Sequence, residues 1–446
     1  MSTIVALSTP RGRGALAVVR LSGPLAINIA TQMAGLGDIE PRRAKLTKLT
    51  KEDQIIDEAI LTCFLAPHSL TGEDVVEISC HGSPAVVRQI VDRMLELGAV
   101  LAGPGEFTLR ALSNGKINLA QAEAIRDLIS AQTDAAVKQA ARQMNGELSN
   151  ILNPFKEKLV DVIVLLESAL EFVEDDLPLP RVSEIEDTLA SVVAGVEKLS
   201  TSFSAGRLLQ DGVRVTIAGR PNVGKSSLFN SLVAHERAIV TEIPGTTRDT
   251  LSEAIDLGGI PVILTDTAGV RQTTDGIETL GIERTHRAMS DADLVLVVID
   301  GADDLGPADR DLLSQTAESR RLIVMNKSDL PSFRDVNGCL GEARTINVSA
   351  LTGEGLDDLR TAMLETLNSA GVEDQGLLIT NVRHYDLLCR TRQEIELAQV
   401  AFRDRHSEEL VLVPLHNALK YLGQITGETT TEDILSEIFA TFCIGK

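Results

Sequence analysis

Apolar positions along this chain of 446 residues follow two different periods. Up to about residue 116, apolar runs of strand length alternate with Gly and Pro turns, and one helix is predicted over Ala85–Leu97. The predicted strands are Ile4–Ser8, Leu16–Leu21, Ala59–Leu65 and Val75–Cys80. From Leu119 to about Leu209 the apolar residues recur at helical spacing, and this spacing returns after residue 375. The pattern predicts a compact α/β domain followed by helices that another segment interrupts.

A second group of strands is predicted between the two helical stretches. Four short apolar runs lie there, and each leads directly into a polar motif. They are Val213–Ala218, Val262–Thr265, Leu322–Met325 and Ile346–Val348. Parallel strands of a doubly wound sheet end at one edge, so we expect the four motifs that follow them to form one site.

The first of these motifs is a phosphate-binding loop. Residues 219–226 read G-R-P-N-V-G-K-S, which matches G-x-x-x-x-G-K-[ST] between a predicted strand and a predicted helix. The glycines let backbone N–H groups surround the phosphates, while Lys225 reaches the β and γ phosphates and Ser226 binds Mg²⁺. The chain is therefore predicted to bind a nucleoside triphosphate.

The next three motifs select the nucleotide. Asp266, in D-T-A-G, can act on Mg²⁺ through water. Asp329, in N-K-S-D, can accept hydrogen bonds from guanine N1–H and the exocyclic amine, which adenine does not offer in this form. Ser349 and Ala350 follow the fourth strand, where backbone N–H groups can contact guanine O6. We therefore expect GTP with Mg²⁺, bound by a Ras-like P-loop G domain with a doubly wound, mainly parallel sheet.

The hydrolytic part of this predicted site departs from Ras-like GTPases. Val270 follows D-T-A-G, where those enzymes carry a Gln that orients water. Asn222 in the phosphate loop can hold a monovalent cation through its side-chain oxygen, and the Thr-rich segment 241–249 can complete the metal shells. The alternative is that Arg248 or Arg271 acts as an arginine finger.

Composition narrows the function classes. The net charge of −22 argues against a surface that wraps nucleic acid, yet residues 1–51 carry eight Lys and Arg against Asp38 and Glu40. This basic region is either an RNA-docking patch or a solvated face. The five cysteines have no metal or disulfide spacing, and no stretch has the pattern of a membrane span or a signal peptide. We expect a soluble, cytoplasmic protein with reduced thiols and no membrane contact.

Further motifs extend along the whole chain. They are P-R-G-R-G from Pro10, T-G-E-D-V-V-E from Thr71, G-E-F-T from Gly105, N-L-A-Q-A-E-A from Asn118 and F-C-I-G-K from Phe442. Together with the G-domain motifs, they resemble the MnmE (TrmE) family of tRNA uridine modification GTPases. The resemblance implies a homodimer that acts with the flavoprotein MnmG on the wobble uridine of certain tRNAs. An aminomethyl or carboxymethylaminomethyl group would be added at C5, with the one-carbon unit supplied by 5-formyl- or methylene-tetrahydrofolate.

The same resemblance, with the apolar pattern, implies the domain organisation. Residues 1–117 would form an α/β domain that binds folate and dimerises. The G domain would comprise residues 211–372. The helical domain would consist of residues 118–210 and 373–446, with the C-I-G-K tail at its end.

Site residues are carried over by motif. The implied K⁺ ligands are Asn222, Thr241, Ile243 and Thr246, and the implied Mg²⁺ ligands are Ser226 and Thr247. The expected GTP-binding set is Asn222, Val223, Gly224, Lys225, Ser226, Ser227, Thr241, Ile243, Gly245, Thr246, Thr247, Asp266, Thr267, Ala268, Gly269, Asn326, Lys327, Asp329, Ser349 and Ala350. The implied catalytic residues are Glu278, which would orient the hydrolytic water through a second water, and Cys443. The implied folate-binding residues are Arg20, Glu77, Lys116 and Lys446.

Residue chemistry alone leaves these last two sets open. A carboxylate suits the N–H edge of a pterin and a cation suits a glutamate tail, but surface ion pairs use the same residues. Without the resemblance, Glu278 is an ordinary exposed acid at a helix start and Cys443 is a packed or inert thiol.

Two other classes share part of the pattern. A ribosome-assembly or translation GTPase would attach an RNA-binding module such as a KH domain, and no such pattern is evident. A GTP-driven membrane switch would need an anchor, and the final C-I-G-K mimics a prenylation box. Lys446 matches the last position of that box poorly. Folate binding would separate the modification enzyme from both classes.

Overall fold

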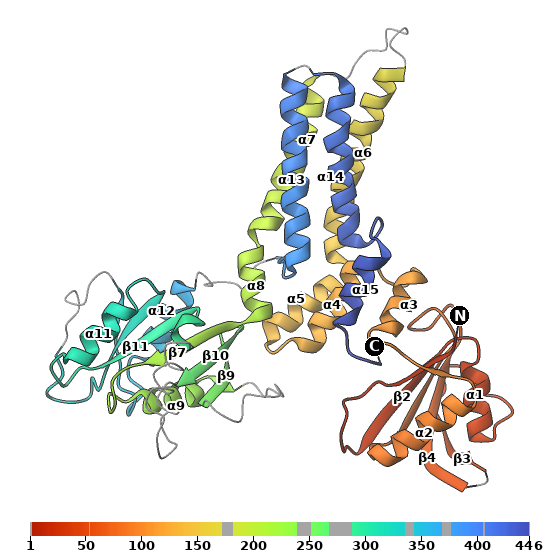
Figure 1. The fold of residues 1–446 in the computed structure, drawn as a ribbon, viewed down its shortest axis with the longest axis horizontal. Helices are drawn as coiled ribbons and strands as arrows, with labels where there is room; N and C mark the ends of the chain where they lie inside the picture. Colours follow the sequence, from red (N-terminus) through yellow and green to blue (C-terminus); the bar gives the residue numbers. More distant parts are fainter. Residues whose placement is uncertain are drawn as a thin grey trace. The chain divides into compact units, whose positions relative to one another are not determined.

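A computed structural model describes residues 2–52, 54–171, 182–238, 251–266, 288–334, 343–367, 376–404 and 406–445. The chain forms two compact units, and Figure 1 shows its elements coloured along the sequence. Unit 1 comprises residues 1–126, 144–149 and 420–446. Unit 2 comprises residues 127–143 and 150–419.

Unit 1 is built on a sheet whose described strands have the order β3-β4-β5-β2-β1-β6. Their bounds are β1 (Ile4–Leu7), β2 (Leu16–Ser22), β3 (Lys45–Lys51), β4 (Gln54–Phe64), β5 (Val75–His81) and β6 (Val100–Leu101). Neighbours are antiparallel except β1 and β6, which are parallel. The register places Arg20 of β2 directly opposite Glu77 of β5. Because side chains alternate between the faces of a strand, this register brings a cation and a carboxylate together on one face.

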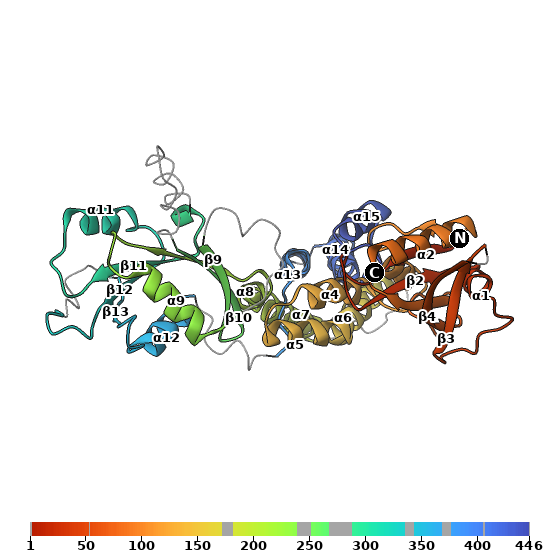
Figure 2. The same cartoon turned by 90° about the horizontal axis from the view of Figure 1, so that it is seen from below.

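Helices α1 (Ala26–Ala34) and α2 (Pro84–Glu96) pack against this sheet (Figure 2). Their apolar residues bury Leu61 and Ile78 completely, while Glu77 remains half-buried. Unit 1 also contains α3 (Glu106–Ser113), the first part of α4 (Leu119–Ser130) and α15 (Glu432–Ala440). Phe439 and Phe442 pack with Leu119 in a small separate core.

The strands and the helix predicted for this unit are confirmed, with differences at their ends. β4 begins at Gln54, five residues before the predicted start, and α2 runs one residue earlier than predicted. α1 and β3 were not predicted.

The G-domain part of unit 2 contains a sheet whose described strands have the order β13-β12-β11-β7-β10-β9-β8. Their bounds are β7 (Val213–Ala218), β8 (Arg237–Ala238), β9 (Leu251–Leu257), β10 (Ile260–Asp266), β11 (Leu294–Asp300), β12 (Arg321–Asn326) and β13 (Thr345–Asn347). Pairing is parallel from β13 to β10, whereas β9 is antiparallel to both β10 and β8. The sheet is flanked by α9 (Lys225–His235), α11 (Pro307–Gln315) and α12 (Leu356–Thr366). Every residue of β11 is buried, as expected for a strand covered on both faces. The predicted mainly parallel, doubly wound sheet is confirmed.

The two helical stretches of the sequence pack together in a bundle (Figure 1). Its elements are α5 (Asp134–Met144), α6 (Glu147–Glu171), α7 (Val182–Thr201), α8 (Phe203–Asp211), α13 (Val382–Arg403) and α14 (Glu408–Thr426). Arg403 of α13 pairs with Glu186 of α7 at 3.3 Å, and His416 of α14 contacts Glu167 of α6 at 3.1 Å. Among the described residues, no helix is both long and apolar enough to cross a membrane.

Candidate functional site

The phosphate loop connects β7 to α9. Asn222 (φ 68°) and Gly224 (φ 97°) adopt left-handed conformations, and a Cβ at position 224 would lie 2.1 Å from Nδ2 of Asn326. Glycine is therefore required at 224 for the close approach of the two loops. Lys225 is buried, and its Nζ donates a hydrogen bond to the carbonyl of Arg220 at 2.8 Å. The Nζ group of Lys225 is thus already held next to the loop in which the phosphates would bind.

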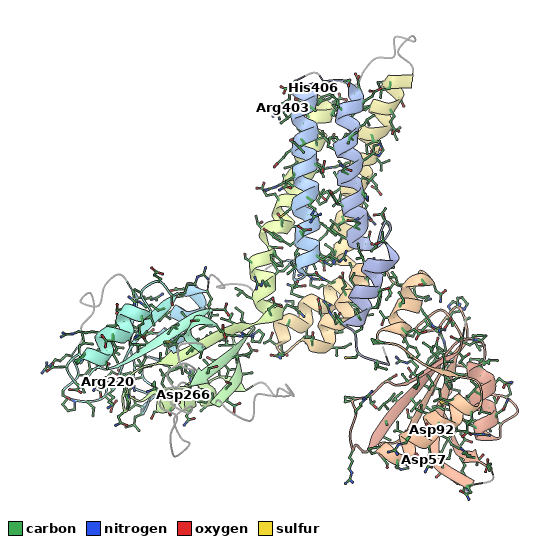
Figure 3. The ribbon with its side chains drawn as sticks, in the orientation of Figure 1. Asp57, Asp92, Arg220, Asp266, Arg403 and His406 are labelled. Atoms are coloured by element: carbon green, nitrogen blue, oxygen red, sulfur yellow. The ribbon has the colours of Figure 1, made fainter. Side chains whose placement is uncertain are left out.

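An oxygen pair suited to Mg²⁺ lies at the start of α9. Oγ of Ser226 donates a 2.7 Å hydrogen bond to Oδ2 of Asp266, the fully buried last residue of β10. Arg220 lies just after β7, and Asp266 is the last residue of the neighbouring strand β10 (Figure 3). These hard oxygens fit Mg²⁺, which binds through few protein groups and keeps waters and phosphate oxygens as its other ligands. The described residues contain no cluster of three or more His, Cys, Asp or Glu that could hold a metal alone.

Asn326, at the end of β12, ties three loops together. Its Nδ2 donates to the carbonyl of Val223 at 2.8 Å, and its Oδ1 accepts the N–H of Ala350 at 3.0 Å. In the structure, the Ala350 N–H therefore serves the contact between loops. The buried Asn326 side chain fixes the phosphate loop relative to the predicted base-binding loops.

The predicted base-recognition residues lie close together. Oδ1 of the exposed Asp329 accepts a 2.6 Å hydrogen bond from Oγ of the buried Ser349. Lys327 (φ 68°) extends its Nζ to Oδ2 of Asp300 at 2.6 Å. Asp300 ends β11 and was missed in the sequence, although the apolar run before it is a strand signal. The carboxylate of Asp329 is thus oriented by a neutral donor.

Ten of the predicted site residues lie outside the described residues. They are Thr241, Ile243, Gly245, Thr246, Thr247, Thr267, Ala268, Gly269, Glu278 and Lys446. Of the predicted K⁺ ligands, only Asn222 is described, and it is exposed on the phosphate loop beside the exposed Ser226 and Ser227.

A second candidate site lies in unit 1, where a pocket of about 400 Å³ opens beside the Arg20–Glu77 pair. Nε and Nη2 of Arg20 both donate to Oε1 of Glu77, at 2.9 and 2.7 Å. The pocket is lined by Arg20, Arg42, Phe64, His68, Ser69, Leu70, Val75 and Glu77. Its volume lies in the range of small-ligand sites, and it combines apolar walls with one carboxylate and two guanidinium groups.

The cations around this pocket differ from the predicted set. Arg42, which was not predicted, lines the pocket and donates from Nη2 to the carbonyl of His68 at 3.1 Å. Lys116 is exposed and bonds the carbonyl of Pro67 at 3.0 Å, next to the pocket-lining His68. The basic N-terminal region was the signal that could have identified Arg42.

Most of the T-G-E-D-V-V-E motif is structural. Ser22 bonds both Thr71 and Glu73 at 2.7 Å, and Arg110 pairs with Glu73 at 3.0 Å and Glu106 at 2.8 Å. Burial disfavours the charged guanidinium, but the hydrogen bonds to Glu106 and Glu73 outweigh it and raise the pKa of Arg110. Of this motif's acids, Glu77 alone lines the pocket.

Cys443 lies on the C-terminal tail, which runs beside β1 in unit 1. Its side chain is exposed, and its carbonyl accepts the N–H of Gly105 at 3.3 Å. Cys63 and Cys80 are buried in the sheet, and burial raises the pKa of both thiols, that of Cys80 to about 11. Of these three thiols, Cys443 is therefore the accessible one.

Known proteins match the chain over its whole length. Residues 3–116 match the family described as GTP-binding protein TrmE N-terminus, and residues 119–443 match the MnmE helical domain. The tRNA modification GTPase MnmE of Koribacter versatilis is 44% identical, over 100% of this chain and 99% of its own length. The proteins with the same name from Aquifex aeolicus and Nitrosomonas europaea are 40% and 42% identical, over 99% and 100% of this chain and 99% of their own lengths. The chain, with its GTPase motifs joined at one sheet edge, belongs to the MnmE family.

Proposed function

We propose that this protein is a GTP-hydrolysing tRNA modification enzyme that acts with the flavoprotein MnmG on the wobble uridine of certain tRNAs. It adds an aminomethyl or carboxymethylaminomethyl group at C5. The observation that carries the GTPase part is the set of contacts joining Lys225, Ser226, Asp266, Asn326 and Asp329 to the ends of neighbouring parallel strands. Family membership carries the tRNA part.

Roles in GTP binding follow from the geometry. Lys225 exchanges its contact with the Arg220 carbonyl for the phosphates, and Ser226 and Asp266 bind Mg²⁺ directly and through water. Asp329, oriented by Ser349, accepts the two N–H groups of guanine. Asn222 contributes to a K⁺ site next to the phosphates.

The pocket of unit 1 is proposed to bind a tetrahydrofolate derivative, which supplies a one-carbon unit when bound. Glu77 accepts hydrogen bonds from the N–H edge of the pterin, and Phe64, Leu70 and Val75 offer apolar contact to its rings. Arg42 and Lys116 suit the negatively charged glutamate tail. We also propose that the protein is a homodimer that pairs through residues 1–117. Sedimentation equilibrium of the nucleotide-free protein tests this part, because a monomer at micromolar concentration contradicts it.

The decisive experiment is mass spectrometry of wobble uridine in cells from which this protein has been deleted, and in the same cells after a variant of it has been supplied. Lys225→Ala and Glu77→Gln are both expected to abolish the modification, but Lys225→Ala alone should abolish GTP hydrolysis. Glu58→Gln is the matched control for Glu77→Gln, since Glu58 is an exposed acid on the neighbouring strand β4. If uridine modification is the same with and without the protein, the alternative of a ribosome-assembly or translation GTPase replaces this proposal.

A further inference from the structure

The guanidinium group of Arg20 is held by three hydrogen bonds within the protein. Nε and Nη2 bind Oε1 of Glu77, and Nη1 donates to the carbonyl of Gly445 at 3.3 Å. The planar group lies 5.7 Å from the ring centre of Phe107. Its side chain is 17% exposed, against 32% for Glu77. Arg20 is therefore arranged to orient Glu77, whose Oε2 makes no bond to it.

The C-terminal tail is held in place by contacts to two segments. Oγ of Ser8 donates to the Gly445 carbonyl at 3.0 Å, so this oxygen accepts from both Ser8 and Arg20. Ile444 forms a bridge with Pro104, and the N–H of Gly105 donates to the Cys443 carbonyl. Gly445 has φ 96°, and a Cβ there would lie 2.2 Å from the carbonyl oxygen of Leu7. Glycine is thus required for the tail to come this close to β1.

We propose that residues 443–445 and Ser8 form a latch that positions Arg20, and through it Glu77, for the ligand of the unit 1 pocket. The inference rests on the proposed folate pocket. The docked tail supplies the carbonyl that holds the outer end of the guanidinium group, opposite the end that binds Glu77. When the tail leaves, Nη1 loses its acceptor and Arg20 gains freedom to rotate, so Glu77 is no longer held in one orientation.

A thermodynamic consequence follows from this arrangement. If the docked tail favours the ligand, the ligand must favour the docked tail by the same factor. The N–H of Gly105 reports on tail docking, because its acceptor is the Cys443 carbonyl on the latch. Binding of ligand should therefore slow the exchange of this amide hydrogen with deuterium.

The test uses the full-length protein with 5-formyltetrahydrofolate as the probe. Gly445→Ala displaces the tail from Leu7. Gly115→Ala is the matched control, since Gly115 also has a positive φ (66°) but nothing within 4 Å of an added Cβ. Ser8→Ala removes one donor to the latch without backbone strain, and Ser8→Thr keeps the hydroxyl. The readouts are probe affinity by calorimetry, the hydrogen–deuterium exchange rate of the Gly105 amide with and without probe by mass spectrometry, and GTP hydrolysis.

In the wild-type protein the probe should slow deuterium exchange of the Gly105 amide. Gly445→Ala and Ser8→Ala should weaken probe binding by about tenfold and reduce this protection, while Ser8→Thr and Gly115→Ala keep both. GTP hydrolysis should be unchanged in all four variants. Wild-type affinity in both Gly445→Ala and Ser8→Ala, together with loss of binding in Glu77→Gln, overturns the latch and leaves the pocket standing. Full binding by Glu77→Gln overturns the pocket and, with it, the latch.

Discussion

Ser349 orients Asp329 through the 2.6 Å hydrogen bond from its hydroxyl to Oδ1. Ser349 follows β13 and is buried, whereas Asp329 follows β12 and is exposed. The bond therefore fixes a carboxylate at the surface by means of a donor from a neighbouring loop. The negative charge of the Asp329 carboxylate stays available to a base that presents two N–H groups.

Asp329→Asn should lower GTP affinity by about 100-fold, because one charged acceptor is lost and an amide N–H₂ faces the guanine N–H edge. The same amide can donate to the C2 carbonyl of xanthine, so affinity for xanthosine triphosphate should rise. Titration with fluorescent analogues of GTP and xanthosine triphosphate measures both affinities. Asp358→Asn, on the exposed first turn of α12, is the control. Unchanged GTP affinity in Asp329→Asn would remove this residue from the base site.

Asn326→Ala should weaken both the G-domain fold and nucleotide binding. The change leaves the Val223 carbonyl and the Ala350 N–H without partners, each costing about 1–3 kcal/mol if water cannot reach it. We expect a lower unfolding temperature of the G domain and at least about tenfold weaker GTP binding. Asn347→Ala, on the neighbouring strand β13, is the matched control because Oδ1 of Asn347 has no hydrogen-bond partner among the residues that the structure describes. Equal effects of the two variants would contradict the bridging role of Asn326.

The parts of the fold that the sequence predicts well are those with strong local signals. Val213–Ala218 forms β7 with the predicted bounds, because this apolar run is bounded by Gly212 and Gly219. β3 was missed because K-L-T-K-L-T-K repeats every three residues instead of alternating. Its strand conformation depends on pairing with β4, in which the register shifts between Leu49 and Thr50.

The contacts within the candidate sites could not be predicted from sequence patterns, because they join residues that are far apart in the chain. Arg20 and Glu77 were each carried over from a family resemblance, but their direct opposition depends on the register between β2 and β5. Neither β11 nor Asp300 at its end was predicted, so the hydrogen-bond partner of Lys327 was not predicted either. The contact of Gly445 with Arg20 joins residues that are 425 positions apart, which no local pattern encodes.

GTP hydrolysis should be at least about tenfold faster in K⁺ than in Na⁺ at equal ionic strength. A larger cation suits a site formed by Asn222 and carbonyl or hydroxyl oxygens, and its charge would offset that of the transition state. Asn222→Ala should remove the difference between the two salts by slowing hydrolysis in K⁺. Phosphate release measured in both salts tests this. Equal rates in wild-type protein would favour the arginine finger, which Arg248→Ala and Arg271→Ala then test.

Iodoacetamide at pH 8 should label Cys443 and leave Cys80 unmodified in the folded protein. Burial raises the pKa of Cys80 to about 11, so only about 0.1% of this thiol is ionised at pH 8, and its access is blocked as well. The thiolate fraction of Cys80 grows tenfold per pH unit up to that pKa, so any labelling of it should rise steeply towards alkaline pH. Peptide mass spectrometry separates the sites. Equal labelling of Cys80 and Cys443 at pH 8 would show that the unit 1 sheet opens.

We expect helix α5 to hold the exit segment, residues 376–378, through which the chain leaves the G domain. Gln139 accepts the N–H of Leu378 at 3.1 Å and donates to the carbonyl of Gly376 at 3.0 Å. Gln143 donates to the carbonyl of Leu378 at 3.0 Å, and Thr133 donates to the carbonyl of Gly259 at 2.6 Å. Gly259 lies in the turn between β9 and β10, and β10 ends at Asp266 of the phosphate site. α5 therefore contacts the exit segment, and Thr133, just before α5, contacts the turn that leads into β10.

Gln139→Ala should release the exit segment without stopping GTP hydrolysis, because the buried Leu378 N–H loses its acceptor while the phosphate loop keeps its contacts. Hydrogen–deuterium exchange at Leu378 should accelerate by about 10-fold or more, as an unpaired amide opens with less free energy. Gln210→Ala is the control, since Gln210 makes a longer, exposed contact of 3.4 Å to Ser130. Unchanged exchange in Gln139→Ala would mean that the core formed by Leu378 with the G domain holds the segment without α5. Faster exchange with unchanged hydrolysis would instead show that α5 holds the exit segment in place without taking part in GTP hydrolysis.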